Sequence, residues 1–228
     1  MRVVWVAAIA LLIGAAPGDD ARGLLTAADL DPVLVLPPPP ATDSPQGRAE
    51  LVELRTMLAT GTPAERDAAA ALGKTKDVSL FAGAVRGLDL TKLPATARLF
   101  ELVRATEKDV VDRGKDEFKR PRPWIVDPAI VPCSRGDDPL SSYPSGHATM
   151  AYSMAGVLVR LIPARAPAIL ARAAEFAQTR LTCDQHFRSD VTAGEALGLL
   201  LAERLMAKPA FAKAFAEARD ELGKAGVR

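Results

Sequence analysis

The chain has 228 residues, enough for one domain with a substantial hydrophobic core. Hydrophobic residues make up 49% of it and charged residues 25%, a balance typical of a soluble globular protein. The formal net charge of +1 argues against a nucleic-acid-binding protein and against a polybasic membrane anchor, so a cluster of positive charge has to be local.

The N-terminus has the layout of a secretory signal peptide. Arg2 precedes an apolar run over residues 3–13, and small residues follow at 14–16. The run is short for a membrane span, and an uncleaved anchor or a buried N-terminal helix is the alternative. We assign residues 1–20 to the signal peptide. No later segment combines the length and apolarity of a span, so we expect an exported protein without membrane contact after signal removal.

Two cysteines, Cys133 and Cys183, fit an exported protein. An even number of cysteines in such a chain indicates a disulfide. Closing this loop of about 50 residues would stabilise the fold by roughly 4 kcal/mol, because the bridge restricts the unfolded chain. Two free buried thiols are the alternative.

A proline-rich stretch, LVLPPPPATDSPQG, occupies residues 34–47. It does not fit regular structure, because successive prolines favour an extended polyproline conformation. We assign residues 21–47 to an N-terminal arm, with a disordered linker as the alternative, and residues 48–228 to a single domain.

Nearly all of that domain shows helical patterns. Leucines share one face of a first helix over residues 47–61, and a second helix opens with Thr62 as N-cap and Glu65 to complete a capping box. Residues 122–143 are predicted to be loop. Further helices are predicted over 77–86, 93–118, 145–162 and 167–179, with two more beginning near 190 and 209. Without alternating apolar runs, the fold class is all-α, with a core formed by helix faces.

The first of three segments that concentrate chemistry is KDEFKRPRP, at the end of the longest predicted helix. It contains Lys115 and Arg122, and the flanking prolines restrict the backbone around Arg122. A rigid arginine with a nearby lysine suits phosphate or another tetrahedral oxyanion. The alternative is a solvated basic helix end that complements the helix dipole.

The second segment, YPSGH, holds one of only two histidines. Pro144 and Gly146 favour a tight turn with Ser145 as N-cap, so the first free N–H groups of the next helix are available to an anion. His147 at this positive end would be a proton donor beside a bound oxyanion, as cleavage of a phosphate ester requires. The alternative is a plain capped helix with an incidental histidine.

The third segment is TRLTCDQHFRSD. Arg180 adds a planar cation, and His186 and Asp190 are four residues apart, so on a helical turn they would share a face. A carboxylate bonded to one imidazole nitrogen leaves the other as a nucleophile. The alternative is a histidine at a helix start with a capping aspartate. Together, the three segments make sense around one tetrahedral oxyanion, and a bridge between the cysteines would tether the two histidine segments.

These segments resemble the three-part signature of the type 2 phosphatidic acid phosphatase superfamily, which includes vanadium haloperoxidases. That signature reads K-x6-RP, PSGH and SR-x5-H-x3-D, and only Thr179 departs from it, at the position of the serine. The signal peptide, the LPPPP arm, CSRGDDPLSSYPSGH and CDQHFRSDVTAG make the chain similar to bacterial class A non-specific acid phosphatases. The likeness runs from about residue 34 to the C-terminus and is weak over 48–93.

The resemblance implies a compact helical bundle without a cofactor or metal ion, in a periplasmic or secreted bacterial protein. It implies that His186 attacks phosphorus to form a phosphohistidine, that Asp190 orients it, and that His147 protonates the leaving alcohol. Five residues would hold the phosphoryl oxygens: Lys115, Arg122, Ser145, Gly146 and Arg180. The expected reaction is metal-independent hydrolysis of small phosphate monoesters with broad specificity. No stable nucleic-acid partner is expected, and a homo-oligomer is compatible with the sequence.

Three alternatives remain open. A vanadate-dependent haloperoxidase would use the same residues with His186 as the vanadate ligand, although such chains are usually much longer. A membrane lipid phosphatase shares the motifs but needs several spans. A non-catalytic phosphate-binding protein would be favoured by loss of either histidine, and both are present.

Overall fold

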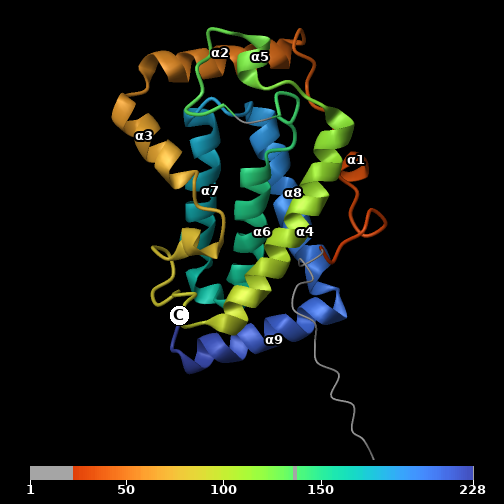
Figure 1. Cartoon of the computed structure of the whole chain (residues 1–228), viewed down its shortest axis with the longest axis vertical. Helices are drawn as coiled ribbons and strands as arrows, with labels where there is room; N and C mark the ends of the chain where they lie inside the picture. The colour runs from red at the N-terminus through yellow and green to blue at the C-terminus, as the bar shows by residue number, and fades with distance from the viewer. Residues whose placement is uncertain (1–22, 136–137, 228) are drawn as a thin grey trace, which may run out of the picture.

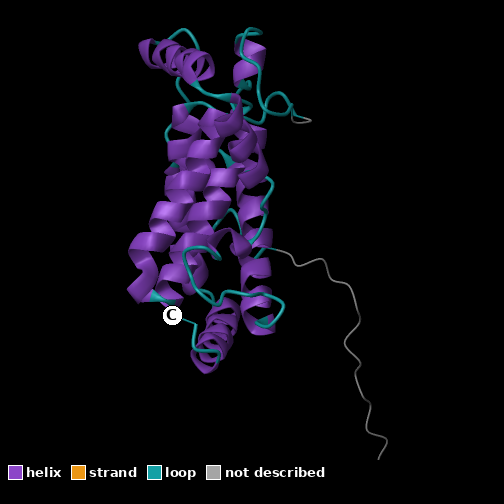
Figure 2. Cartoon of the chain, turned by 90° about the vertical axis from the view of Figure 1, so that its left-hand side faces the viewer, coloured by secondary structure: helices purple, strands orange, loops and turns teal. Residues whose placement is uncertain are grey.

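The computed structural model describes residues 23–135 and 138–227, so the predicted signal peptide lies outside the described residues. Within these ranges every regular element is a helix, which confirms the all-α prediction (Figure 2). Among the described residues, each helix is too short or too polar to span a lipid bilayer.

Four long helices run side by side and form the body of the molecule (Figure 1). They are α4 (Pro94–Phe118), α6 (Gly146–Leu161), α7 (Ala166–Thr182) and α8 (Arg188–Met206). Helix α9 (Pro209–Lys224) crosses one end of this bundle. At the opposite end lie α2 (Pro45–Thr60) and the short α5 (Pro123–Val126), while α3 (Pro63–Leu72) packs against α7.

Three shorter elements complete the described helices: α1 (Pro32–Val35), η1 (Val78–Phe81) and η2 (Pro163–Arg165). Side-chain caps mark the starts of α2 at Ser44, of α3 at Thr62 and of α6 at Ser145, close to where the sequence predicts these helices to begin. The Thr62 hydroxyl accepts a hydrogen bond from the Glu65 N–H at 3.2 Å, and the Glu65 carboxylate accepts one from the Thr62 N–H at 2.8 Å. At the other end of the longest helix, Lys119 adopts φ 42°, a left-handed conformation that stops α4 directly before the prolines.

The helix predicted over residues 77–86 is wrong in extent. The structure has only the 3₁₀ turn η1 there, followed by irregular turns up to Gly87, which adopts φ 85°. Val78, Phe81 and Val85 are all fully buried. Their spacing of three and four residues matches a helix, yet successive turns bury the same positions without a continuous hydrogen-bond ladder. Two smaller differences are the helical turns α1 and α5, which fall within segments predicted to be extended or loop.

Close contact between α6 and α8 fixes the position of the first turn of α6, which begins directly after Ser145. A Cβ atom at Gly194 would lie 2.5 Å from the Ser145 carbonyl oxygen, and one at Gly198 would lie 2.6 Å from the Thr149 carbonyl oxygen. Glycine at both positions lets the two backbones touch. As a result, the first turn of α6 sits directly against the first turns of α8.

The predicted disulfide is present between Cys133 and Cys183, whose Cα atoms are 4.9 Å apart. The Cys133 N–H also donates to the Cys183 carbonyl oxygen at 3.1 Å. The bridge therefore ties the loop after α5 to the end of α7, close to the segment that carries His186.

Candidate active site

Both histidines line one cavity of about 590 Å³. It lies at the end of the bundle where α4 and α7 end and where α6 and α8 begin. Six of the eight residues predicted for the site line this cavity: Lys115, Arg122, Gly146, His147, Arg180 and His186. The other two, Ser145 and Asp190, are fully buried behind its wall.

His186 is buried and held at both ring nitrogens. Its Nδ1 lies 2.7 Å from the Ser142 carbonyl oxygen, which can only accept, so Nδ1 carries the proton. Its Nε2 is then unprotonated and lies 2.8 Å from an Arg122 guanidinium nitrogen. Burial, followed by the charges of Arg122 and Arg180, holds the imidazole pKa well below its usual range. The ring is therefore neutral, with its lone pair at Nε2.

The relation between His186 and Asp190 differs from the predicted one. His186 precedes α8, whereas Asp190 lies in the first turn of that helix, so the two do not share a helical face. The Asp190 carboxylate is 3.5 Å from Nδ1, farther than the Ser142 carbonyl oxygen. The backbone carbonyl, which sequence reasoning had no means of locating, is the nearer partner.

Asp190 instead connects the segments on either side of His186. Its carboxylate accepts hydrogen bonds from the Ser142 hydroxyl at 2.6 Å, the Phe187 N–H at 2.8 Å and Arg120 at 2.6 Å. Burial raises its pKa, against the lowering effect of Arg120. Arg120 also pairs with the buried Glu50 at 2.9 Å. Asp190 thus fixes the chain around the imidazole.

The three predicted cations, Lys115, Arg122 and Arg180, all line the cavity. Arg122 donates to the Gln185 carbonyl oxygen at 2.8 Å and to the Ser141 hydroxyl at 3.1 Å. Burial, followed by Arg122, lowers the pKa of Arg180 to about 10 and also lowers the pKa of Lys115. Within the described residues, the buried Nε atoms of both arginines lack a hydrogen-bond partner. An oxyanion in the cavity would relieve this concentration of positive charge.

His147 reaches the cavity from the first turn of α6. Its Nε2 lies 3.1 Å from the Gly73 carbonyl oxygen and 2.7 Å from the Lys76 ammonium nitrogen. A proton at Nε2 would be donated to the carbonyl, whereas a lone pair there would accept from Lys76. Burial, then Arg180 and Lys76, holds the His147 pKa well below its usual range.

Lys76 is a residue that sequence reasoning missed. It lies in the loop after α3, in the polar stretch GKTKD, which looks like any solvated connection. Lys74 from the same loop also lines the cavity, as does Gln185 next to His186. No signal in the sequence places this loop beside His147, because the contact spans about 70 residues of chain.

Ser145 and Gly146 contribute in different ways. The buried Ser145 hydroxyl accepts from the Ala148 N–H at 3.4 Å and so caps α6, as predicted. The Ser145 N–H donates to the Asp190 carbonyl oxygen at 3.0 Å. Gly146 forms part of the cavity wall, where an added Cβ would lie 3.6 Å from the Lys115 ammonium nitrogen. Ser145 therefore stabilises the first turn of α6 without lining the cavity.

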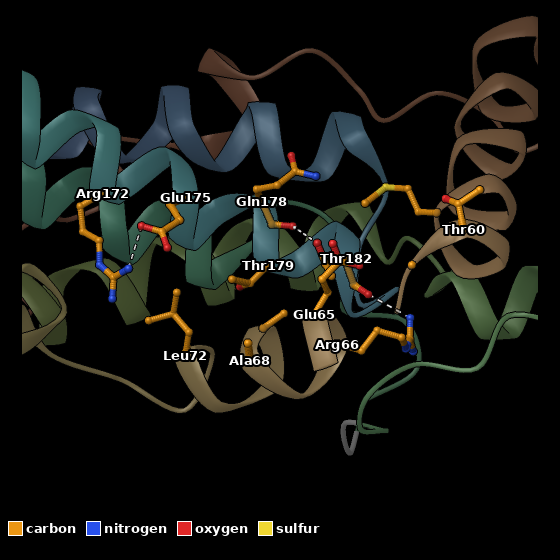
Figure 3. Close-up of a pocket in the computed structure, with 13 residues that line it drawn as sticks. Thr60, Glu65, Arg66, Ala68, Leu72, Arg172, Glu175, Gln178, Thr179 and Thr182 are labelled. Atoms are coloured by element: carbon orange, nitrogen blue, oxygen red, sulfur yellow. Dashed lines mark hydrogen bonds and ion pairs between the residues drawn. The ribbon is translucent and has the colours of Figure 1, made fainter. Parts of the chain in front are cut away.

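A wider cavity of about 730 Å³ lies between α3 and α7 but contains neither histidine (Figure 3). Its charged side chains already form ion pairs or hydrogen bonds within the protein. Arg172 pairs with Glu175 at 2.7 Å, Arg66 pairs with Asp184 at 2.5 Å, and Glu65 belongs to the capping box of α3. Both lining arginines therefore already have carboxylate partners, so the described residues of this cavity offer no unpaired cation to a phosphate.

Comparison with known proteins agrees with the motifs. The family profile described as PAP2 superfamily matches residues 102–212. An acid phosphatase of Zymomonas mobilis is 34% identical over 204 residues, which cover 86% of this chain and 76% of the relative. A non-specific acid phosphatase of Salmonella typhi is 30% identical, covering 82% of this chain and 78% of the relative. One of Providencia stuartii is also 30% identical, covering 86% and 82%.

Among solved structures, the chain is similar to a transmembrane PAP2-type phosphatidylglycerolphosphate phosphatase from Bacillus subtilis, with a TM-score of 0.55. The match covers 71% of this chain and 85% of that one at 20% sequence identity, so it shows a shared fold. The expected helical bundle is thereby confirmed. Because relatives of 30% identity or more align along most of its length, the chain belongs to the bacterial acid phosphatases of the PAP2 superfamily.

Proposed function

We propose that this protein hydrolyses small phosphate monoesters through a phosphohistidine at His186, without a metal ion. One observation carries the proposal: the unprotonated Nε2 of a buried, neutral imidazole opens beside Arg122 into a cavity that Lys115 and Arg180 also line. The acid phosphatases among its relatives support the same reaction class.

In the first step, the phosphoryl oxygens bind the guanidinium groups of Arg122 and Arg180 and the ammonium group of Lys115. The Arg122 N–H that faces Nε2 in the free protein turns to the phosphoryl group, which frees the Nε2 lone pair. Nε2 forms a bond to phosphorus while the bond to the ester oxygen breaks. His147 donates a proton to that oxygen, which leaves as an alcohol.

In the second step, water attacks the phosphorus of the phosphohistidine. His147, now neutral, accepts a proton from that water. The bond between phosphorus and Nε2 breaks, its electron pair returns to the imidazole, and inorganic phosphate is released. Throughout, Asp190 is a positioning residue that acts through Ser142 and the backbone of Phe187.

We expect the reaction to favour acidic pH. His186 stays neutral there, because burial and two arginines depress its pKa. His147 has to be protonated to serve as an acid, and its pKa is depressed chiefly by burial, then by Arg180 and Lys76. A bound phosphate dianion offsets those two positive charges, so substrate binding raises the His147 pKa.

The donors around the cavity are cations and imidazoles, a set that suits an anion better than a metal ion. We therefore expect turnover to persist in excess EDTA. Vanadate, a tetrahedral oxyanion like phosphate, should inhibit by occupying the same cavity.

The decisive experiment replaces the nucleophile. His186→Ala should lower turnover of an aryl phosphate by at least about a thousandfold, as removal of a covalent nucleophile does. The wild-type protein, quenched in base during turnover of a radiolabelled substrate, should carry base-stable phosphate, and the variant should carry none. A folded variant that retains turnover, or a wild type without label, would contradict the phosphohistidine.

The role of His147 is tested by leaving groups. His147→Ala should slow hydrolysis of alkyl phosphates far more than that of 4-nitrophenyl phosphate, whose phenolate leaves without a proton. Equal losses for both substrates would refute the assignment of His147 as the acid.

We further propose that the protein is exported in its bacterial host and works in the periplasm or outside the cell. The disulfide and the predicted signal peptide support this location. Phosphatase activity that stays with the cytoplasmic fraction after osmotic shock and is absent from the medium would contradict it.

A further inference from the structure

The 590 Å³ cavity that holds both histidines is called the phosphoryl cavity below. A second, smaller cavity of about 240 Å³ adjoins it beside His147. Four residues belong to the walls of both: Lys76, Lys115, Gly146 and His147. On its far side, the smaller cavity is lined by α4, with Arg104 and Lys108 among the lining side chains. If His147 protonates the leaving oxygen, the alcohol part of a substrate extends toward this second cavity.

The charge in this smaller cavity is not balanced. In the part of the chain that the structure describes, four cations line it together with two carboxylates, Glu107 and Asp112. Glu107 pairs with Arg104, and Asp112 pairs with Lys108 at 3.0 Å. Among the described residues, Lys76 forms no ion pair, and the hydrogen-bond partner of its ammonium group is the neutral His147. Lys76 and Lys115 thus leave an excess of positive charge.

The pKa values of two groups agree with this picture. Burial, then the charges of Arg180 and Arg104, lowers the pKa of Lys76, so its ammonium group experiences a positive surrounding. Burial raises the pKa of Glu107 to about 7, against the lowering effects of Arg104 and Lys115. Protonation of Glu107 at acidic pH would remove its negative charge and so add to the excess of positive charge around Arg104.

We propose that the smaller cavity is a subsite for a second phosphoryl group, so that preferred substrates carry another phosphate a few bonds from the ester that is cleaved. Lys76 stands between the two cavities and would contact this second group together with Arg104. The inference rests on the proposed function, because the role of His147 decides which way the alcohol points.

Two substrates with the same kind of leaving group test the subsite. Propyl phosphate and 3-phosphonopropyl phosphate differ only in a phosphonate that cannot be hydrolysed. We expect the wild type to prefer the phosphonate-bearing ester by at least about tenfold in kcat/KM, equivalent to about 1.4 kcal/mol, because charge-assisted hydrogen bonds are stronger than neutral ones. Binding of the phosphonate end in the phosphoryl cavity lowers kcat and KM alike, so their ratio is unaffected by it.

Two lysines of the same loop provide variant and control. Lys76→Met should reduce the preference to about twofold or less. Loss of the contact between Lys76 and His147 should change the hydrolysis rates of both esters by the same factor. The ratio of the two kcat/KM values therefore reports on the smaller cavity alone. Lys74→Met removes a lysine that lines the phosphoryl cavity but not the smaller one, so this variant should keep the preference for the phosphonate-bearing ester. The proposal would be overturned if the wild type showed no preference between the two esters. It would also be overturned if both variants lost the preference equally, because the effect would then come from the general positive charge around the cavities.

A binding measurement separates this inference from the proposed function. By calorimetry, propane-1,3-bisphosphonate should bind the wild type at least about tenfold more tightly than propylphosphonate, and Lys76→Met should remove the difference. If neither ester were hydrolysed but this difference persisted, the phosphatase mechanism would fail and the subsite would stand. If esters were hydrolysed without any difference in binding, the subsite would fail alone.

Discussion

At the scale of single residues, Arg120 holds the site together without lining the cavity. One guanidinium nitrogen lies 2.6 Å from the Asp190 carboxylate and the other lies 2.9 Å from that of Glu50. Both carboxylates are buried, and the guanidinium also stacks on the Phe187 ring at 4.2 Å. Arg120 therefore links α2 to the first turn of α8, which follows His186 in the chain.

Replacing this arginine should be costly. Arg120→Met leaves two buried carboxylates without their cation, and breaking a buried ion pair typically destabilises a protein by about 3–5 kcal/mol. Arg55→Met is the matched control, because Arg55 pairs with Asp127 while its own side chain is 60% exposed, and such pairs contribute about 0–1 kcal/mol. Urea unfolding of the two variants measures the difference. Similar losses in both would show that the buried network is dispensable.

The sequence identifies the motif residues but not the direction in which each points. Arg120 and Arg122 stand in one RPRP segment, and nothing local tells the cavity-lining arginine from the buried one. Their partners decide: Glu50 and Asp190 are each 70 residues from Arg120. The same holds for Lys76, whose place beside His147 depends on how α3 packs against α7.

At the scale of elements, the backbone contact between α6 and α8 sets the position of His147. Gly194→Ala would put a methyl group 2.5 Å from the Ser145 carbonyl oxygen, one residue before the turn that carries the site. We expect a loss of about 2–3 kcal/mol from overpacking. We also expect a clear fall in kcat, because the start of α6 has to shift.

A second glycine supplies the comparison. Within the described ranges, an added Cβ at Gly223, in α9, has no neighbouring atom within 4 Å. Gly223→Ala should therefore stabilise slightly, by about 0.5–1 kcal/mol, through the higher helix propensity of alanine. Thermal unfolding and steady-state kinetics on both variants give the test. If Gly194→Ala behaved like Gly223→Ala, the close helix contact would not be what fixes the site.

Helices with explicit start and stop signals are predicted within about three residues. Thr62 and Glu65 mark the start of α3, Ser145 marks the start of α6, and the prolines after α4 mark its end. The prediction of a helix over residues 77–86 was wrong, because apolar spacing indicates which positions are buried and not whether the backbone between them forms a helix. In that segment tertiary packing rather than a local ladder holds the turns.

At the scale of the whole molecule, the titration of Glu107 should make stability depend on pH. Its pKa rises from 4.5 to about 7 on folding, chiefly because it is buried. The folded protein thus keeps a proton that the unfolded chain releases. This contribution to stability is complete below about pH 4.5 and is lost as pH rises through about 7, to an extent of about 3 kcal/mol.

Glu107→Gln removes this dependence, because glutamine does not titrate. The variant should gain stability relative to the wild type as pH is raised from 5 to 8, measured as the difference in unfolding midpoint at each pH. Glu101→Gln, at an exposed position of the same helix, provides the baseline. A constant difference between Glu107→Gln and the wild type across this range would show that Glu107 does not titrate on unfolding.

The last helix, α9, crosses the end of the bundle that lies opposite the cavity with both histidines (Figure 1). A linker added after α9 would therefore leave from the inert side. Protein attached to a bead through such a linker should present its open cavity to the solution and turn over substrate nearly as fast as free protein, whereas attachment through residues near α2 should obstruct entry.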